Sequence, residues 1–198
     1  MMNDLRAEQG TTVEYREIRR SRHGEKLRWL VSQEQIQDTA TGQSLTRSFI
    51  RHPGICVIVP FLEDGKILLL HQYRYAVKEA LWELPAGTIA GHEQYQRIVA
   101  TEAPENCAAR ELMEETGFEA SRLEKFTECY AIPGSGDELM HFFYAFELTK
   151  RKQALDIGEL ISEVRAFSFS EIETMIASGG IRDAKTLIGL FYRLRRKL

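Results

Sequence analysis

Apolar and polar residues alternate along the first quarter of the chain and then give way to short unbroken apolar runs. The alternation across residues 11–51 predicts antiparallel strands, with Thr41-Gly42 as a turn between two of them. The runs 55–62 and 66–72 flank Asp64-Gly65, a pair typical of tight hairpin turns, so we expect a central hairpin there. The N-terminal strands carry too few apolar residues for their own core, which predicts packing on the rest of the chain or on a second copy.

Helical periodicity appears in the second half of the chain. A proline in the first turn and Gly117 at the expected C-cap predict a helix over residues 104–116. Further strands and two closing helices are expected at residues 123–131, 139–148, 161–169, 171–177 and from Asp183 onward. Leu187, Phe191 and Leu194 should form the apolar face of the last helix. Because strands and helices mix without regular βαβ alternation, the pattern predicts an α+β fold.

Composition places the chain among ordinary globular proteins. Of its 198 residues, 43% are hydrophobic and 28% charged, and the formal net charge of -3 supplies no field for binding a polyanion. No apolar run approaches the roughly 20 residues of a membrane helix, and the first residues show no signal-peptide pattern. The three cysteines lack a C-x-x-C pair, which excludes a zinc site or a disulfide framework. We therefore expect a cytoplasmic protein without a nucleic-acid or membrane partner.

One face of the predicted helix concentrates acidic residues. Glu111, Glu114 and Glu115 stand at i, i+3 and i+4, so their carboxylates lie on one face within one turn. They lie near the helix C-terminus, where the helix dipole disfavours negative charge, so the cluster is destabilising unless a cation neutralises it. Hard oxygen ligands favour Mg²⁺ or Mn²⁺. A solvated acidic face is the alternative, although a glycine-containing loop precedes the helix and Arg110 adjoins the cluster.

Around this face the sequence resembles the Nudix hydrolases, whose box reads G, five residues, E, seven residues and then R-E-U-x-E-E-x-G-U, where U is aliphatic or aromatic. Residues 87–93 match the first half, and residues 110–118 match the second half at every specified position. Sixteen residues separate Glu93 from Arg110 where the box has seven, whereas Glu102 does lie seven residues before Arg110. A nine-residue insertion explains both spacings and leaves open whether Glu93 or Glu102 takes the place of the box glutamate.

The resemblance extends beyond the box to the ADP-ribose pyrophosphatase branch of the family. Four segments carry it: Gln72-Tyr73-Arg74, Trp82-Glu83-Leu84-Pro85-Ala86-Gly87, Pro133-Gly134-x-x-Asp137-Glu138 and Gly158-Glu159-Leu160-Ile161. It implies a Nudix α/β/α sandwich with a mixed sheet over residues 52–198, preceded by a small antiparallel β layer over residues 1–51. It also implies a Mg²⁺ cofactor, with Mn²⁺ as a substitute, and a homodimer in which the N-terminal strands are exchanged between subunits.

The resemblance assigns roles to particular residues. It implies metal ligands at Glu111, Glu115 and the Ala86 carbonyl, with Glu114 as a third carboxylate ligand or as a support behind the others. Glu114 and Glu115 also belong, with Glu159, to the implied catalytic residues. Among these, Glu159 is the base that takes the proton from the attacking water.

Three further residues are expected to contact the substrate. Arg74 should hold a phosphate, because a guanidinium binds such oxygens bidentately, with an ordinary surface arginine as the alternative. Glu138 is expected at the metal site or the terminal sugar. Trp29 either stacks on the nucleobase or is buried in the N-terminal layer or a dimer interface.

Glu163 competes with Glu159 for the role of general base, because one extra residue after Glu159 blurs the register of the pattern.

The resemblance implies metal-dependent hydrolysis of ADP-ribose to AMP and ribose 5-phosphate, or hydrolysis of a related nucleoside-diphosphate sugar. GDP-mannose or another sugar nucleotide is the alternative substrate. A non-catalytic sensor that binds a nucleotide sugar is a further alternative, which the intact carboxylates disfavour.

Overall fold

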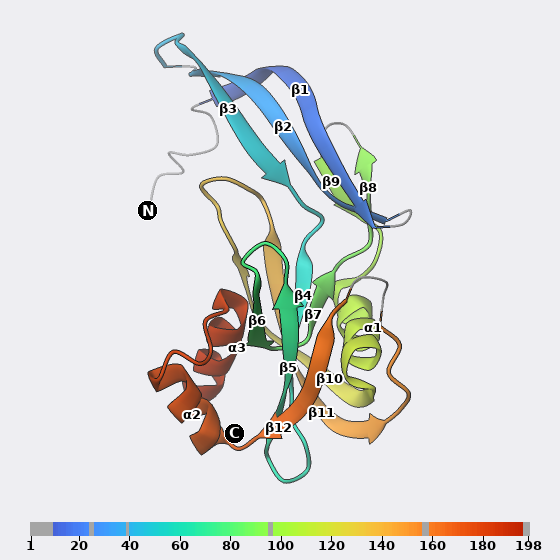
Figure 1. Ribbon diagram of the computed structural model, residues 1–198. Coiled ribbons are helices and arrows are strands. Elements are labelled where there is room, and N and C mark those ends of the chain that lie inside the picture. The colour runs from blue at the N-terminus through green and yellow to red at the C-terminus, as the bar shows by residue number, and fades with distance from the viewer. Residues whose placement is uncertain (1–9, 24–25, 39, 95–96, 156–158, 196–198) are drawn as a thin grey trace, which may run out of the picture. The chain divides into compact units, whose positions relative to one another are not determined.

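The structure is a computed structural model that describes residues 10–23, 26–38, 40–94, 97–155 and 159–195 (Figure 1). Contacts within the chain divide it into two compact units. The first unit comprises the chain up to Gly54 with residues 90–101 and 130–139, and the second comprises residues 55–89, 102–129 and 140 onward.

The first unit is built on a three-stranded antiparallel sheet. β1 (Gly10–His23) pairs with β2 (Lys26–Asp38), which pairs with β3 (Ser44–Arg51), as the alternating pattern predicts. The predicted turn between β2 and β3 is confirmed: the Asp38 carboxylate accepts two backbone N–H bonds, at 2.8 and 3.1 Å. Gly42 has a φ of 73°, a left-handed conformation that glycine adopts without strain.

The insertion in the box forms a hairpin within this first unit. β8 (Gly91–Gln94) pairs antiparallel with β9 (Arg97–Ala100), and β8 contacts β2. The loop before β11 is tied to the end of β3, because the Asp137 carboxylate accepts bonds from the Arg51 side chain at 3.1 Å and the His52 backbone N–H at 2.8 Å. The first unit therefore combines three separate stretches of the chain.

The second unit contains two sheets. One has the strand order β10 (Phe118–Tyr130), β11 (Leu139–Lys150), β4 (Ile55–Pro60), β7 (Ala86–Thr88), and the other the order β12 (Ile161–Phe167), β5 (Ile67–Arg74), β6 (Glu79–Glu83). β11 runs parallel to β4, whereas β7 runs antiparallel to it. The first of these sheets is therefore mixed, as expected.

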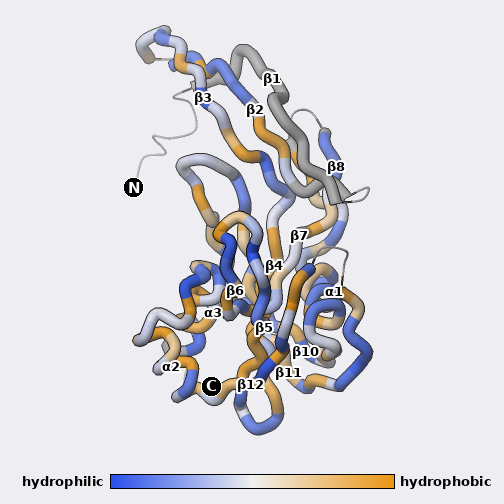
Figure 2. Tube along the Cα trace, viewed as in Figure 1, coloured by the Kyte–Doolittle hydropathy of each residue, from blue (hydrophilic) through white to orange (hydrophobic). Residues whose placement is uncertain are grey.

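The predicted central hairpin is wrong beyond its turn. The backbone N–H of Leu62 donates to the carbonyl of Lys66 at 2.8 Å, but β4 and β5 then pair only through Phe61 and Ile67. β4 is buried from Cys56 to Pro60 and β5 from Ile67 to Leu70, and Figure 2 shows the hydrophobic colour along β4. Because each strand needs neighbours along both edges and cover on both faces, β4 and β5 lie in the interior of separate sheets.

The helix that carries the acidic face lies where the sequence predicts it. α1 (Pro104–Thr116) ends at Gly117, whose φ of 72° and N–H bond to the Met113 carbonyl form the expected left-handed cap. The core cluster beneath α1 includes Cys56, Ile58, Ile89, Cys107, Ala108, Leu112 and Phe143. This packing fixes one side of α1 on β4 and thereby sets the direction of its acidic side.

Two helices close the second unit. α2 (Phe169–Ala177) begins with a capping box at Ser168, and α3 (Ala184–Arg195) follows Asp183. The predicted N-cap of α3 is confirmed, because Asp183 Oδ2 accepts the backbone N–H of Thr186 at 3.0 Å.

The apolar face predicted for α3 is wrong at Phe191, whereas Leu187 is partly buried. Phe191 is 48% exposed, whereas Thr186 and Leu190 are fully buried, and the side chain of Leu194 lies outside the described residues. The Thr186 hydroxyl accepts the backbone N–H of Leu84 at 2.8 Å, which turns this side of the helix inward. A buried polar bond to the end of β6 thus decides the orientation of α3, and hydropathy alone does not indicate it.

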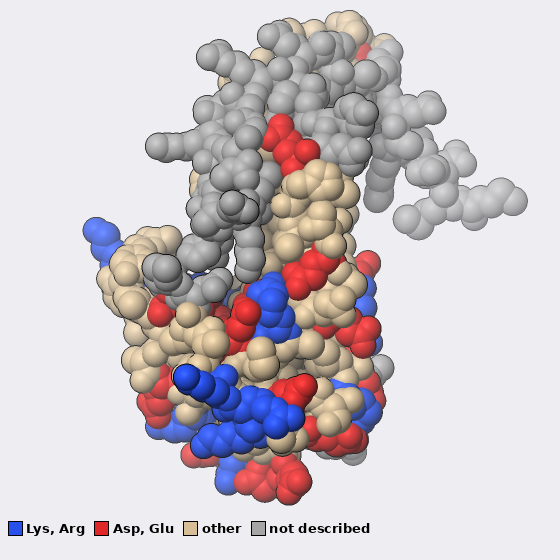
Figure 3. Space-filling view, turned by 90° about the vertical axis from the view of Figure 1, so that its right-hand side faces the viewer, with Lys and Arg blue, Asp and Glu red and all other residues tan. Residues whose placement is uncertain are grey.

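The described surface carries charges of both signs. In the view of Figure 3, Lys and Arg side chains lie next to Asp and Glu side chains. Within the described part of the chain, no helix is both long enough and apolar enough to cross a membrane. The small net charge of -3 therefore reflects interspersed charges and not a scarcity of them.

Candidate active site

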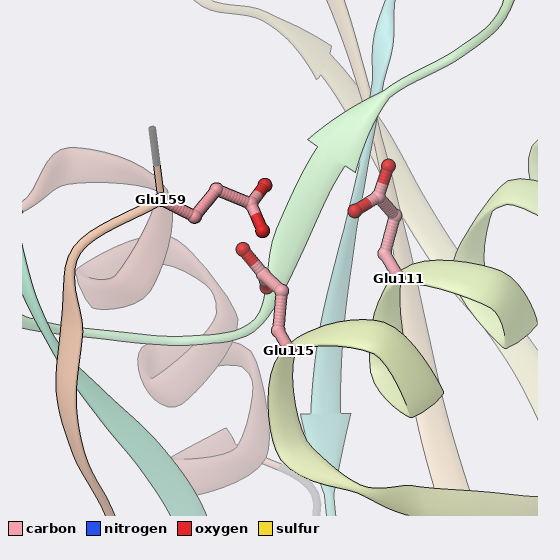
Figure 4. A group of neighbouring side chains, drawn as sticks. All are labelled: Glu111, Glu115 and Glu159. Atoms are coloured by element: carbon pink, nitrogen blue, oxygen red, sulfur yellow. The ribbon is translucent and has the colours of Figure 1, made fainter. Parts of the chain in front are cut away.

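Three carboxylates converge in the second unit (Figure 4). Glu111 and Glu115 stand one turn apart on α1, and Glu159 belongs to the segment that leads into β12. One oxygen of each lies within 4.8 Å of the others, and the three side chains point toward one another. Glu111 is 7% and Glu115 only 2% exposed. The structure thus adds a residue from 44 positions further along the chain to the pair that helix spacing predicts.

The surroundings of these carboxylates disfavour negative charge in the absence of a cation. Burial raises the pKa of Glu111 from 4.5 to about 7, and the positive charge of Arg110 opposes this shift only in part. Burial and the neighbouring charge of Glu111 raise the pKa of Glu115 well above its usual range, although the Ala86 N–H donates to Glu115 Oε2 at 2.9 Å. A bound cation would favour the ionised form of both groups.

The donor set fits Mg²⁺ or Mn²⁺. Carboxylate oxygens are hard ligands, and Mg²⁺ binds them at about 2.0–2.1 Å, so ligands on opposite sides of one ion stand about 4 Å apart. The 4.8 Å limit on the distances among the three carboxylates is close to that spacing. For Ala86 the structure shows a bond from its N–H, and the predicted role of its carbonyl as a ligand stays a prediction.

Arg110 organises the other acidic residues of the box. Its guanidinium contacts both oxygens of Glu102 at 3.1 Å, Glu111 at 2.6 Å and Glu114 at 2.9 Å. Glu102 therefore lies beside Arg110, whereas Glu93 lies on β8 in the first unit. Glu114 binds Arg110 and lies outside the group of three converging carboxylates, so its predicted role as a ligand stays a prediction.

Gly87 has no room for a side chain. A Cβ atom added there would lie 1.8 Å from the carboxyl carbon of Glu111. Behind it, the Cys56 and Cys107 thiols lie 3.6 and 3.7 Å from the Gly87 carbonyl and 2.9 Å from each other. The backbone at Gly87 thus passes directly against the Glu111 carboxylate, and a residue with a side chain would have to displace that carboxylate.

Arg74, at the end of β5, is held by a carboxylate that the sequence analysis missed. Its Nε and Nη2 donate to the two oxygens of Glu83 at 2.7 and 2.6 Å, and Lys185 of α3 pairs with the same carboxylate. Burial lowers the pKa of Arg74, but Glu83 and then Glu115 outweigh this effect, so the pKa is raised overall. The available signal was a single acidic residue inside the apolar run Trp82–Pro85.

Glu159, and not Glu163, joins the converging carboxylates. Glu163 lies on β12 with an exposed side chain whose Oε1 is 3.8 Å from Nη1 of Arg165. The register of β12 against β5 shifts between Ile161 and Glu163, which is where the sequence carries one extra residue. Such a register shift accommodates an extra residue in one strand, and Glu159 lies with Glu111 and Glu115.

Two predicted substrate contacts belong to the first unit. Glu138 Oε2 lies 3.7 Å from Nε2 of His52. Trp29 lies on β2, pairs with Ser21 of β1 and is partly buried. The structure describes both residues within that unit, and their roles toward a substrate stay predictions.

Comparison with known proteins identifies the family to which this chain belongs. The family model described as NUDIX domain matches residues 50–188, and the chain therefore belongs to the Nudix family, as its box indicates. An ADP-ribose pyrophosphatase of Bacillus subtilis (strain 168) is 33% identical over 153 residues, which cover 76% of this chain and 77% of that protein. A GDP-mannose pyrophosphatase of Yersinia enterocolitica is 32% identical over 160 residues, covering 79% and 82%.

Two further proteins are similar to this chain, one in sequence and one in fold. A methanol dehydrogenase activator of Bacillus methanolicus is 31% identical over 153 residues, covering 76% of this chain and 77% of that protein. The crystal structure of an ADP compounds hydrolase superposes with a TM-score of 0.71 at 19% identity, covering 93% of this chain and 91% of that one. The expected α+β Nudix fold is thereby confirmed.

Proposed function

We propose that the chain is a metal-dependent hydrolase of the diphosphate bond of ADP-ribose, giving AMP and ribose 5-phosphate, or of a related nucleoside-diphosphate sugar. The convergence of Glu111, Glu115 and Glu159, with the Arg74 guanidinium under the electrostatic influence of Glu115, carries the proposal. Membership in the Nudix family and the similarity to proteins named for this hydrolysis support it.

The side chains divide the work of hydrolysis. Glu111 and Glu115 would hold Mg²⁺, which when bound neutralises charge on the non-bridging phosphate oxygens and positions a water. Arg74 binds a phosphate oxygen through its remaining N–H donors. The Glu159 carboxylate accepts the proton of the water as its oxygen bonds to phosphorus. The bond from that phosphorus to the bridging oxygen breaks, and the second phosphate leaves on its sugar.

GDP-mannose is the second candidate substrate. The relative named GDP-mannose pyrophosphatase covers slightly more of this chain than the ADP-ribose pyrophosphatase does, at nearly the same identity. Both substrates present the same diphosphate to the carboxylates and to Arg74. They differ in the base and the terminal sugar, which Trp29 and Glu138 are proposed to contact.

A substrate panel tests the proposal. ADP-ribose, GDP-mannose and other nucleoside-diphosphate sugars are incubated with the protein in Mg²⁺, in Mn²⁺ and in EDTA, and the products are identified by chromatography. Release of AMP and ribose 5-phosphate in Mg²⁺, and no turnover in EDTA, is the expected result. Turnover that persists in EDTA, or the absence of cleavage of every sugar nucleotide, would contradict the proposal.

We also propose that the protein works as a homodimer in the cytoplasm. Among the described side chains of β2 and β3, Leu30 is the one buried apolar residue, and Leu45 is 45% exposed. A second copy would cover the apolar positions and edges of this sheet. Sedimentation at micromolar concentration should give about twice the 22.8 kDa mass of the chain. A fully active monomer would exclude a pocket shared between subunits.

A further inference from the structure

Glu83 is a buried acid for which the proposed chemistry has no direct use. It is the last residue of β6, 1% exposed, three positions before Ala86, whose N–H binds Glu115. A carboxylate so deeply buried is strongly destabilising unless cations pair with it. Arg74 and Lys185 are the two cations that do so.

The bond from Glu83 fixes the plane of the Arg74 guanidinium. Nε and Nη2 each donate to a separate oxygen, at 2.7 and 2.6 Å, which is the two-point geometry that holds an arginine most rigidly. A guanidinium carries five N–H donors. In the described part of the chain, no hydrogen bond involves the other three, which lie on the edges turned away from Glu83. The side chain of Arg74 is 38% exposed, so these donors are accessible to a ligand.

Glu83 is itself anchored by Lys185, which binds the same carboxylate oxygen as Nη2 of Arg74. Its Oε2 pairs with Nζ of Lys185, and the same Nζ donates to Asp183 at 2.9 Å. Asp183 also caps α3 through the backbone N–H of Thr186. The carboxylate of Glu83 is therefore held between the first turn of α3 and the end of β5, and it has little freedom to rotate.

We infer that Glu83 is a positioning residue for substrate binding: it orients Arg74 so that the unoccupied donors of the guanidinium face the diphosphate, and Lys185 keeps Glu83 in place. The inference rests on the proposed function, because it takes Arg74 as the phosphate ligand. Charge alone would not require this arrangement. Through the two-point bond, Glu83 fixes the orientation of the guanidinium and does more than balance its charge.

A double-mutant cycle on the full-length protein tests the inference. With ADP-ribose as substrate, Glu83→Gln should raise KM roughly tenfold, the lower end of the effect of a lost orienting partner. Its kcat should change less than about twofold, because phosphate binding acts on ground state and transition state alike. Once Arg74→Ala has removed the guanidinium, adding Glu83→Gln should change KM less than about twofold.

Glu79→Gln is the matched control. Glu79 lies on the same strand and pairs with Arg182 just before α3, but both side chains are at least half exposed. This variant should keep wild-type kinetics. If Glu83 is merely structural, Glu83→Gln should lower Tm and should change KM by the same factor in the wild type and in Arg74→Ala. That result would overturn the inference. If Glu83→Gln does not fold, Glu83→Asp, which keeps the charge but withdraws from Arg74, provides the same test.

Binding of inorganic pyrophosphate, measured by calorimetry in Mg²⁺, separates this inference from the proposed function. If no sugar nucleotide is hydrolysed but Glu83→Gln weakens pyrophosphate binding about tenfold, the proposed substrate is wrong and the positioning role stands. If ADP-ribose is hydrolysed and Glu83→Gln alters neither KM nor pyrophosphate affinity, the positioning role is wrong and the function stands.

Discussion

Replacing Glu111 with glutamine tests whether the converging carboxylates serve a cation or stabilise the fold. Burial raises the pKa of Glu111 from 4.5 to about 7, and a shift of this size corresponds to about 3 kcal/mol. Glutamine has the shape of the neutral carboxyl group and carries no charge to desolvate. In the metal-free protein at pH 8, Glu111→Gln should therefore raise the free energy of unfolding by about 1–3 kcal/mol, or Tm by roughly 3–10 °C.

The pH dependence of this effect has a defined sign. Between pH 4.5 and about 7, folded Glu111 retains a proton that the unfolded chain releases. The contribution of Glu111 to the stability of the metal-free wild type therefore falls as pH rises through this window and stays constant above it. Glu111→Gln lacks the slope, so the difference between variant and wild type should be small near pH 4.5 and should reach its full size above pH 7.

Thermal melts in EDTA and in Mg²⁺ measure both effects. Saturating Mg²⁺ should stabilise the wild type, by about 2.7 kcal/mol at a hundred times its Kd, and should affect Glu111→Gln much less. The order of the two melting temperatures is then expected to reverse between EDTA and Mg²⁺. Glu119→Gln removes an acid from an exposed pair with Arg151 and should shift stability by less than about 0.5 kcal/mol. A metal-free Glu111→Gln protein that melts well below the wild type would show that this glutamate is structural, and the reasoning would fail.

Three further variants probe separate parts of the site. Glu159→Gln should lower kcat by about 10²–10⁴-fold with a small change in KM, whereas Glu163→Gln should behave as wild type; equal losses in the two would remove Glu159 as the base. Gly87→Ala places a methyl group against the Glu111 carboxylate and should displace it, so activity in Mg²⁺ should collapse, and an active variant would show that the Glu111 side chain can shift without loss of function. Trp29→Ala should raise KM more than it lowers kcat, because stacking on a base is uniform binding; unchanged kinetics in an intact dimer would place Trp29 at the interface.

The sequence was most informative where structure depends on neighbours along the chain. The i, i+4 spacing of Glu111 and Glu115 predicts their common face, and the cap at Gly117 ends α1 at the expected residue, because helix geometry alone determines both features. The antiparallel strands of the first unit follow in the same way from alternation and from the turn chemistry around Gly42.

Features that depend on long-range packing were harder to predict. Two apolar runs around a good turn look like a hairpin, and no local signal indicates that β4 and β5 enter different sheets. Glu83 could not be recognised as the partner of Arg74 and Lys185, because the three residues meet only after β5, β6 and α3 have packed. The choice between Glu159 and Glu163 likewise depended on a register shift between β12 and β5, which is a property of strand pairing.

The insertion does not disturb the acidic site, because it begins and ends at positions that lie close together. The backbone N–H of Thr101 donates to the carbonyl of Ala90 at 2.7 Å and closes the inserted hairpin at its base. The next residue, Glu102, already contacts Arg110 through both oxygens. Chain added beyond a closed base costs little further entropy and does not move the residues outside it. What the site requires is therefore the contact of Glu102 with Arg110 and the close approach of Gly87 to the helix, and the number of residues between them is free to vary.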